Sequence, residues 1–269
     1  MELVRSSWLE LWRRNRSGGI LTLAFWYTLI TTLYQYLVAA RLGPDLPKEL
    51  TRLINHPAVI RVMPHLAPAL WVKLGLVYAT FLLVILPFAV GGLYGGVASA
   101  IRDTPDRTSF VAFFKYGYRN FWRALAQVVL AVIYAAIVVG IVTGLFLALS
   151  AVGPGGPVAG IIAVIVGAAG MLWLVGTALY WFGQTFASSV SPVHGWPLII
   201  RWGARHVGRL MSSTILLVAA LLVTLFVTTL LASLIPVLGE VVLVLVLGMI
   251  MPAYLATYAV VLYQQYPPS

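Results

Sequence analysis

The chain has 269 residues, of which 61% are hydrophobic and only 9% are charged. About a quarter of the residues of an ordinary soluble domain are charged, so this composition excludes one and indicates a protein embedded in a membrane. The formal net charge of +10 comes from basic residues that flank long apolar runs, where they would meet lipid phosphates. We therefore expect no nucleic acid partner.

Few residues are suited to catalysis. The chain has 7 acidic residues and no cysteine, which leaves few candidates for general acid–base chemistry and none for a thiolate nucleophile. No phosphate-binding glycine loop and no Ser/His/Asp arrangement is recognisable. The four histidines do not supply the three or four convergent ligands of a metal site. We expect no enzyme activity, no metal and no cofactor. The histidines are His56, His65, His194 and His206.

Two apolar runs open the chain, and each is long enough for the roughly 20 residues that cross a bilayer. Residues 20–40 follow a basic segment, and their apolar core is longer than that of a cleaved signal peptide, so we expect them to remain as a span. The second run, 74–101, contains Pro87. Proline removes a backbone hydrogen bond and clashes with the preceding turn, which predicts a bend there.

The rest of the chain contains two more pairs of apolar runs. Residues 124–200 contain no Lys, Arg, Asp or Glu and are too long for one crossing, so they must fold back at the glycine- and proline-rich segment 152–157. The segment 235–240 divides the last apolar region in the same way, and Pro252 lies within its final run. The four predicted spans are 124–151, 158–184, 210–235 and 241–264.

Basic residues predict the orientation of these six spans. Twelve of the 17 Lys and Arg residues fall on the side of the termini, so the positive-inside rule predicts that both termini are cytoplasmic. The other five lie in the first external loop, 41–73, and they leave a re-entrant hairpin open as an alternative. Helical spacing of Leu46, Leu50 and Leu53 predicts a short amphipathic helix in that loop.

The cytoplasmic connections share a pattern that predicts an internal repeat. The basic residues of 115–123 and of 201–209 coincide at a constant offset of 86, as does an aromatic residue followed by glycine. Residues 11–15 form a weaker third copy. We predict an all-α, polytopic integral membrane protein whose six transmembrane helices form three hairpins, each preceded by a basic interfacial amphipathic helix. The predicted repeats are about 1–102, 103–190 and 191–269.

These basic segments are the candidate docking surface. Positions four apart share one face of a helix, so each set of three basic residues predicts a column of cations facing lipid phosphates. Each cation near an anionic leaflet contributes about 1 kcal/mol of attraction. The columns either fix the topology alone or dock an anionic lipid headgroup or a protein partner. The candidate docking residues are Arg13, Arg14, Lys115, Arg119, Arg123, Arg201, Arg205 and Arg209.

Inside the spans the polar residues are uncharged. Mid-membrane Asp, Glu, Lys, Arg and His are absent, which argues against proton-coupled transport. Tyr94, Tyr180 and Tyr254 occupy the second span of each predicted pair, where they either line a shared central cavity or pack between helices. Glycines at small-xxx-small spacing predict close helix packing, with a dimer interface as the alternative. They are Gly91, Gly92, Gly95, Gly96, Gly140 and Gly144.

Part of the chain resembles a known group of proteins. The runs 87–94, 102–103, 109–110 and 113–117 resemble the membrane domain attached to some glycerophosphoryl diester phosphodiesterases and its stand-alone prokaryotic six-span relatives. The resemblance implies a bacterial or archaeal cytoplasmic-membrane protein without an established activity. It carries over no catalytic residue, because the residues that it covers belong to the membrane domain.

Two functions are consistent with these features of the sequence. The first is a non-enzymatic scaffold or accessory subunit that docks anionic lipid, a protein partner or a second copy of itself through its basic cytoplasmic helices. The alternative is a transporter or permease component for an apolar or amphiphilic solute, which requires a cavity inside the bundle.

Overall fold

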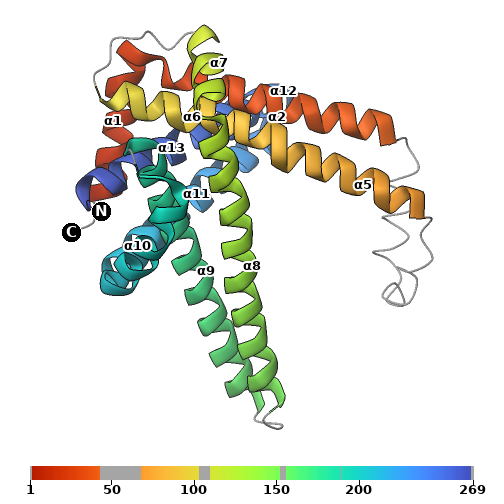
Figure 1. Ribbon diagram of the computed structural model, residues 1–269, viewed down its shortest axis with the longest axis vertical. Helices are drawn as coiled ribbons and strands as arrows, with labels where there is room; N and C mark the ends of the chain where they lie inside the picture. The colour runs from red at the N-terminus through yellow and green to blue at the C-terminus, as the bar shows by residue number, and fades with distance from the viewer. Residues whose placement is uncertain (1, 43–67, 103–109, 152–155, 189, 268–269) are drawn as a thin grey trace.

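The computed structural model describes residues 2–42, 68–102, 110–151, 156–188 and 190–267 (Figure 1). The elements within these residues are α-helices and two five-residue π-helical turns. The predicted amphipathic helix of the first external loop, together with His56 and His65, lies outside the described residues.

Along the chain, each of three short helices precedes two longer helical segments. The short helices are α1 (Glu2–Gly18), α7 (Phe110–Arg119) and α10 (Pro192–Arg205). Four of the longer segments are single helices: α2 (Ile20–Leu42), α8 (Phe121–Ala151), α9 (Gly156–Ala187) and α11 (Val207–Leu234). The other two contain a π turn: α5 (Pro68–Thr80), η2 (Phe81–Ile85) and α6 (Leu86–Ile101), then α12 (Pro236–Leu245), η3 (Val246–Ile250) and α13 (Met251–Gln265).

In the described part of the chain, five helical segments are long and apolar enough to cross a membrane, which makes this an all-α, multi-pass membrane protein. Helix α2 is not among the five. Its 23 residues include four threonines, three tyrosines and a glutamine, which lower its mean hydropathy. A sixth crossing by α2 therefore stays a prediction. The five segments are Gly75–Ile101, Phe121–Leu145, Val164–Ala187, Val207–Leu234 and Val241–Gln265.

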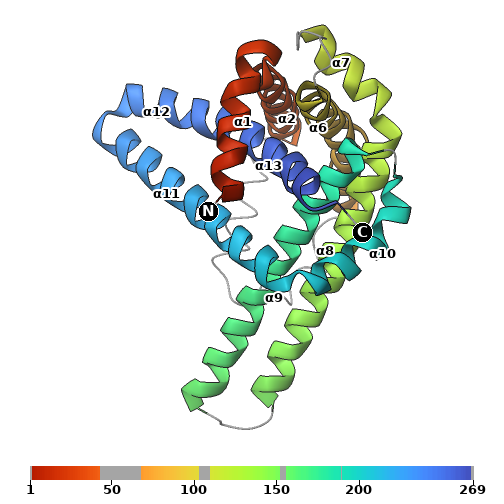
Figure 2. The same cartoon turned by 90° about the vertical axis from the view of Figure 1, so that its left-hand side faces the viewer.

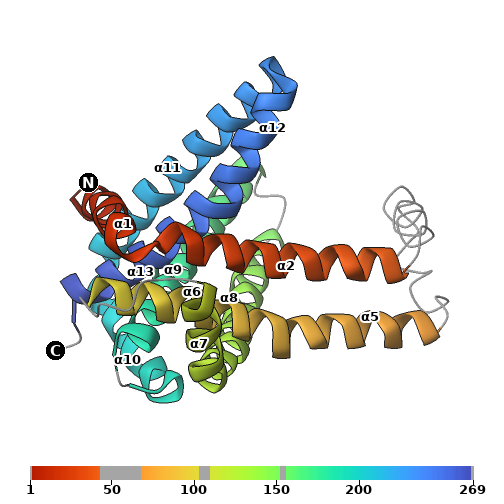
Figure 3. The same ribbon diagram turned by 90° about the horizontal axis from the view of Figure 1, so that it is seen from above.

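The long helices diverge from a common centre. Figure 1 shows α8 and α9 running side by side away from it, while α2 and α5 leave in another direction, and Figure 3 shows α11 and α12 forming a third arm. The two termini lie together, because α1 packs on α13. Gln265 Nε2 donates to Ser6 Oγ at 3.2 Å, and Tyr254 Oη donates to the carbonyl of Val4 at 3.3 Å.

Local chemistry explains where the short helices end. Gly19 separates α1 from α2 with a φ of 60°, a left-handed conformation that suits glycine at a helix C-terminus. The side chain of Asn15 then accepts a hydrogen bond from the N–H of Leu21 at 3.0 Å, so it caps the first turn of α2. Asn120 interrupts the helix between α7 and α8, and His206 does so between α10 and α11.

Each π turn lies directly before a proline. Pro87 and Pro252 are each the second residue of the α-helix that follows a π turn. A proline cannot bond to the carbonyl four residues before it, and its ring crowds that carbonyl, so a wider turn relieves the clash. At Pro252 the freed carbonyl belongs to Gly248, and it accepts a hydrogen bond from Thr28 Oγ1 of α2. The bend predicted at Pro87 is therefore accommodated as a π turn within a continuous helical segment.

Glycines on α6 allow two neighbouring helices to approach it. A Cβ atom added to Gly92 would lie 2.7 Å from the ring of Phe113 on α7, and one added to Gly96 would lie 2.6 Å from Leu23 on α2. Gly91 faces the backbone of α7 at a corresponding distance of 3.3 Å, and Gly95 faces Asn120. These four predicted positions all lie at close contacts of α6.

The two predicted glycines of α8 have no such close contacts. A Cβ atom added to Gly140 or Gly144 would meet no other atom of the described residues within 4 Å. The closest backbone approach is instead made by Gly183 of α9, which lies against the carbonyl group of Ala259 on α13. The small-xxx-small pattern therefore located the contacts of α6 but not the contact between α9 and α13.

Candidate functional site

The helix breaks divide the predicted columns of basic residues. Lys115 and Arg119 belong to α7, whereas Arg123 belongs to the first turn of α8, because the helix is interrupted at Asn120. The predicted column is therefore divided between two helices. His206 divides the second column in the same way, so its last arginine lies on α11.

Despite the break, three arginines from three helices line one cavity of about 540 Å³, which we call the arginine pocket. Arg102 follows the last residue of α6, Arg119 ends α7, and Arg123 lies near the start of α8. The other lining residues are Gly95, Ala98, Ser99, Tyr116, Asn120, Phe186 and Ser188.

The arginine pocket is rich in hydrogen-bond donors and contains no carboxylate among its described lining residues. Arg123 donates from Nη2 to the carbonyl of Val190 at 2.7 Å, which fixes its guanidinium group in place. Ser99 Oγ and Tyr116 Oη share a hydrogen bond of 2.6 Å. Arginines grouped without a counter-charge repel one another, and guanidinium groups match the geometry of phosphate and carboxylate oxygens. This donor set suits a phosphate group.

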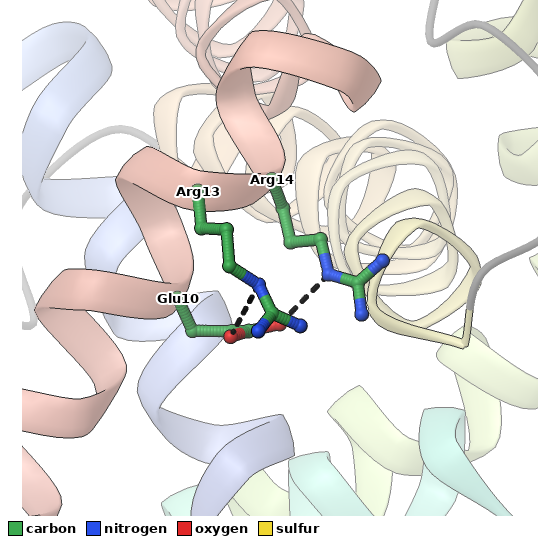
Figure 4. A network of polar contacts seen from close by, with 3 residues as sticks. All are labelled: Glu10, Arg13 and Arg14. Carbon is green, nitrogen blue, oxygen red and sulfur yellow. Dashed lines mark hydrogen bonds and ion pairs between the residues drawn. The ribbon is translucent and has the colours of Figure 1, made fainter.

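The N-terminal candidates Arg13 and Arg14 have a different environment (Figure 4). Arg14 Nε donates to Glu10 Oε1 at 2.8 Å, and Arg13 Nε lies 3.4 Å from Glu10 Oε2. One carboxylate thus partly neutralises both guanidinium groups. The side chain of Arg13 is 68% exposed, and exposed ion pairs contribute little to stability.

A second cavity of about 310 Å³, which we call the small polar pocket, lies between α10, α11, α1 and α13. Three of its residues are the counterparts, at the offset of 86, of residues that line the arginine pocket. It also includes Glu2 and therefore combines both signs of charge. The corresponding pairs are Tyr116 and Trp202, Asn120 and His206, and Arg123 and Arg209.

The third cavity is larger and mainly apolar. It has a volume of about 910 Å³ and lies between α1, α11 and the η3–α13 segment, and we call it the apolar cleft. Glu2 and Leu216 line both this cleft and the small polar pocket. The other residues of the cleft are Val4, Arg5, Trp8, Ala219, Ala220, Leu221, Val223, Thr224, Val246, Ile250, Met251 and Tyr254.

The three candidate tyrosines have separate environments. Tyr94 packs against Phe182 with ring centroids 5.2 Å apart. Tyr180 stacks on Trp202 at 3.8 Å, and Tyr254 lines the apolar cleft. These contacts give Tyr94 and Tyr180 a packing role, which was one of the two alternatives. A cavity shared by all three tyrosines stays a prediction.

Sequence reasoning missed several residues of these cavities. Arg102 lies outside the two aligned segments, and Asn120 is not one of the predicted docking residues. Asn120 and His206 correspond at the offset of 86, a signal that marks both pockets. Within the described residues no group of three or more His, Cys, Asp or Glu is arranged to hold a metal ion.

Comparisons with family models, with curated proteins and with solved structures found no match to this chain. The function is therefore argued from the geometry of its cavities.

Proposed function

We propose that this is a non-enzymatic protein of a prokaryotic cytoplasmic membrane that docks the phosphate headgroup of an anionic lipid in its arginine pocket. In this proposal both termini are cytoplasmic and six helices cross the membrane as three repeated hairpins, which requires the three arms to lie parallel instead of diverging as they do in Figures 1 and 3. The protein then acts as a scaffold or accessory subunit that is held at, or recruits, anionic lipid. The proposal includes kinship with the membrane domain of glycerophosphoryl diester phosphodiesterases.

The convergence of three arginines carries this proposal. Arg102, Arg119 and Arg123 come from three helices, and no described carboxylate lines their pocket. The pocket lies at the ends of α6 and α7 and the start of α8, and the ends of membrane spans are where lipid headgroups are found. Charge-assisted hydrogen bonds from guanidinium groups to phosphate are about twice as strong as neutral ones.

The test removes two of these arginines and leaves the third in place. Arg102→Ala with Arg119→Ala preserves the bond from Arg123 to Val190. The protein is purified in detergent and mixed with equal amounts of phosphatidylglycerol and phosphatidylcholine, and native mass spectrometry measures the ratio of the two lipids bound. We expect the wild type to prefer phosphatidylglycerol, and the double variant to lose about tenfold or more of that preference.

The matched control is Arg201→Ala with Arg205→Ala, because these arginines lie outside all three cavities and remove the same charge. At physiological ionic strength, where charges are screened beyond about 8 Å, the control should keep most of the preference for phosphatidylglycerol over phosphatidylcholine. Equal losses in both double variants would show a general charge effect and contradict the proposal. A stoichiometric acidic protein that is lost only with the pocket variant would make a protein the ligand instead of lipid.

A carrier for an apolar or amphiphilic solute is the second candidate function. The apolar cleft favours it, because a cavity of about 910 Å³ with mainly apolar walls is within the range of small-molecule sites. The test measures solute transport into proteoliposomes by the wild type and by a variant in which a large side chain fills the cleft.

A further inference from the structure

The small polar pocket and the apolar cleft lie next to each other. Helices α1 and α11 line both cavities, and Glu2 and Leu216 belong to both linings. Figure 2 shows the N-terminal end of α1 close to α11 and α13. Together they offer a charged end and a hydrocarbon-like end to one ligand.

The charged end offers groups of both signs. His206 Nδ1 donates to the carbonyl of Trp202 at 3.0 Å, since a carbonyl can only accept, and this leaves Nε2 to accept a hydrogen bond from a ligand. Arg209 lines the same pocket. Glu2 is the carboxylate of this pocket, and within the described residues the ion pairs involve Glu10 alone. Arg209 and Glu2 are therefore available to a ligand that carries a negative and a positive group.

The apolar end is suited to hydrocarbon. Its walls are mainly aliphatic side chains of α11 and of the η3–α13 segment, with Arg5 and Trp8 of α1 at one side. Cavities with apolar walls are not stably filled by water. The π turn η3 supplies Val246 and Ile250 to this wall, and π turns occur frequently at functional sites.

We propose that phosphatidylethanolamine occupies both cavities. Its phosphate lies by Arg209, its ammonium group lies by Glu2 and Nε2 of His206, and an acyl chain passes Leu216 into the apolar cleft. The charges pair with opposite side chains, and the primary ammonium can donate hydrogen bonds to the Glu2 carboxylate, which a choline group cannot do. The inference rests on the proposed lipid docking, but its site and its preferred headgroup differ from those of the arginine pocket.

The test measures how much phosphatidylethanolamine the full chain retains through detergent washing, by native mass spectrometry. Ala220→Trp fills the apolar cleft, and Ala136→Trp on an exposed face of α8 is its control. Arg209→Gln removes the phosphate partner, and Arg205→Gln is its control. We expect the wild type and both controls to retain one phosphatidylethanolamine molecule, Ala220→Trp to retain none, and Arg209→Gln to bind about tenfold more weakly.

A second measurement uses chains that keep both cavities intact. Phosphatidylethanolamine with brominated acyl chains should quench the fluorescence of Trp8, obtained as the difference between the wild type and Trp8→Phe. Absence of this quenching, retention of lipid by Ala220→Trp, or retention of detergent alone would overturn the inference. The arginine-pocket variants Arg102→Ala and Arg119→Ala should leave phosphatidylethanolamine retention unchanged, so this inference and the proposed function can fail separately.

Discussion

The contact between α9 and α13 predicts a large effect of adding one methyl group. Gly183 is buried, and a Cβ atom added to it would collide with the carbonyl oxygen of Ala259 and lie 2.6 Å from the carbonyl carbon. The obstacle is backbone, so no side-chain rotation relieves it. Gly183→Ala must push the two helices apart.

The magnitude follows from two opposing effects. Overpacking a core typically lowers the free energy of unfolding by 1–3 kcal/mol, and we take about 3 kcal/mol for a collision with backbone atoms. Replacing glycine by alanine in a helix stabilises the folded state by up to about 1 kcal/mol, because alanine has the higher helix propensity. Gly183→Ala should therefore lower the free energy of unfolding by about 2 kcal/mol.

The matched control is Gly140→Ala on α8, where nothing lies within 4 Å of the added atom. This variant keeps only the gain in helix propensity, so the two variants should differ by about 3 kcal/mol, which corresponds to about 6–12 °C in Tm. The assay is thermal unfolding in detergent, followed by circular dichroism. A Tm for Gly183→Ala within about 2 °C of that for Gly140→Ala would refute the described packing of α9 on α13.

Two further substitutions test buried polar groups, with unfolding in detergent as the measurement. Both amide atoms of Gln184 are buried without a hydrogen-bond partner among the described residues, so Gln184→Met should stabilise the protein by about 1–3 kcal/mol; destabilisation would show that the amide is hydrogen-bonded to buried water. Tyr134 Oη bonds to Thr177 Oγ1 at 2.8 Å, so Tyr134→Phe should cost about 1 kcal/mol, and an unchanged stability would contradict this hydrogen bond.

The ends of the long helices were predictable because hydropathy and turn chemistry are local. The predicted spans 124–151 and 210–235 differ by three residues or fewer at each end from α8 and α11. A chain in hydrocarbon must satisfy its backbone hydrogen bonds within each helix, so an apolar run of sufficient length has few alternatives. The same local reasoning missed the helix break at Asn120, because charge periodicity continues across it.

The tertiary structure decided which faces of these helices meet. The small-xxx-small spacing predicted a helix contact at Gly140, which has no close neighbour in the described chain. It did not predict the contact of Gly183, which approaches α13 most closely. Arg102 joins Arg119 in one pocket only because the end of α6 lies beside α7. Hydropathy and charge describe one helix at a time, whereas a pocket depends on the rotation and position of several. The sequence therefore determined the membrane class and the approximate bounds of the long helices, and the packing of the helices determined which residues line each cavity.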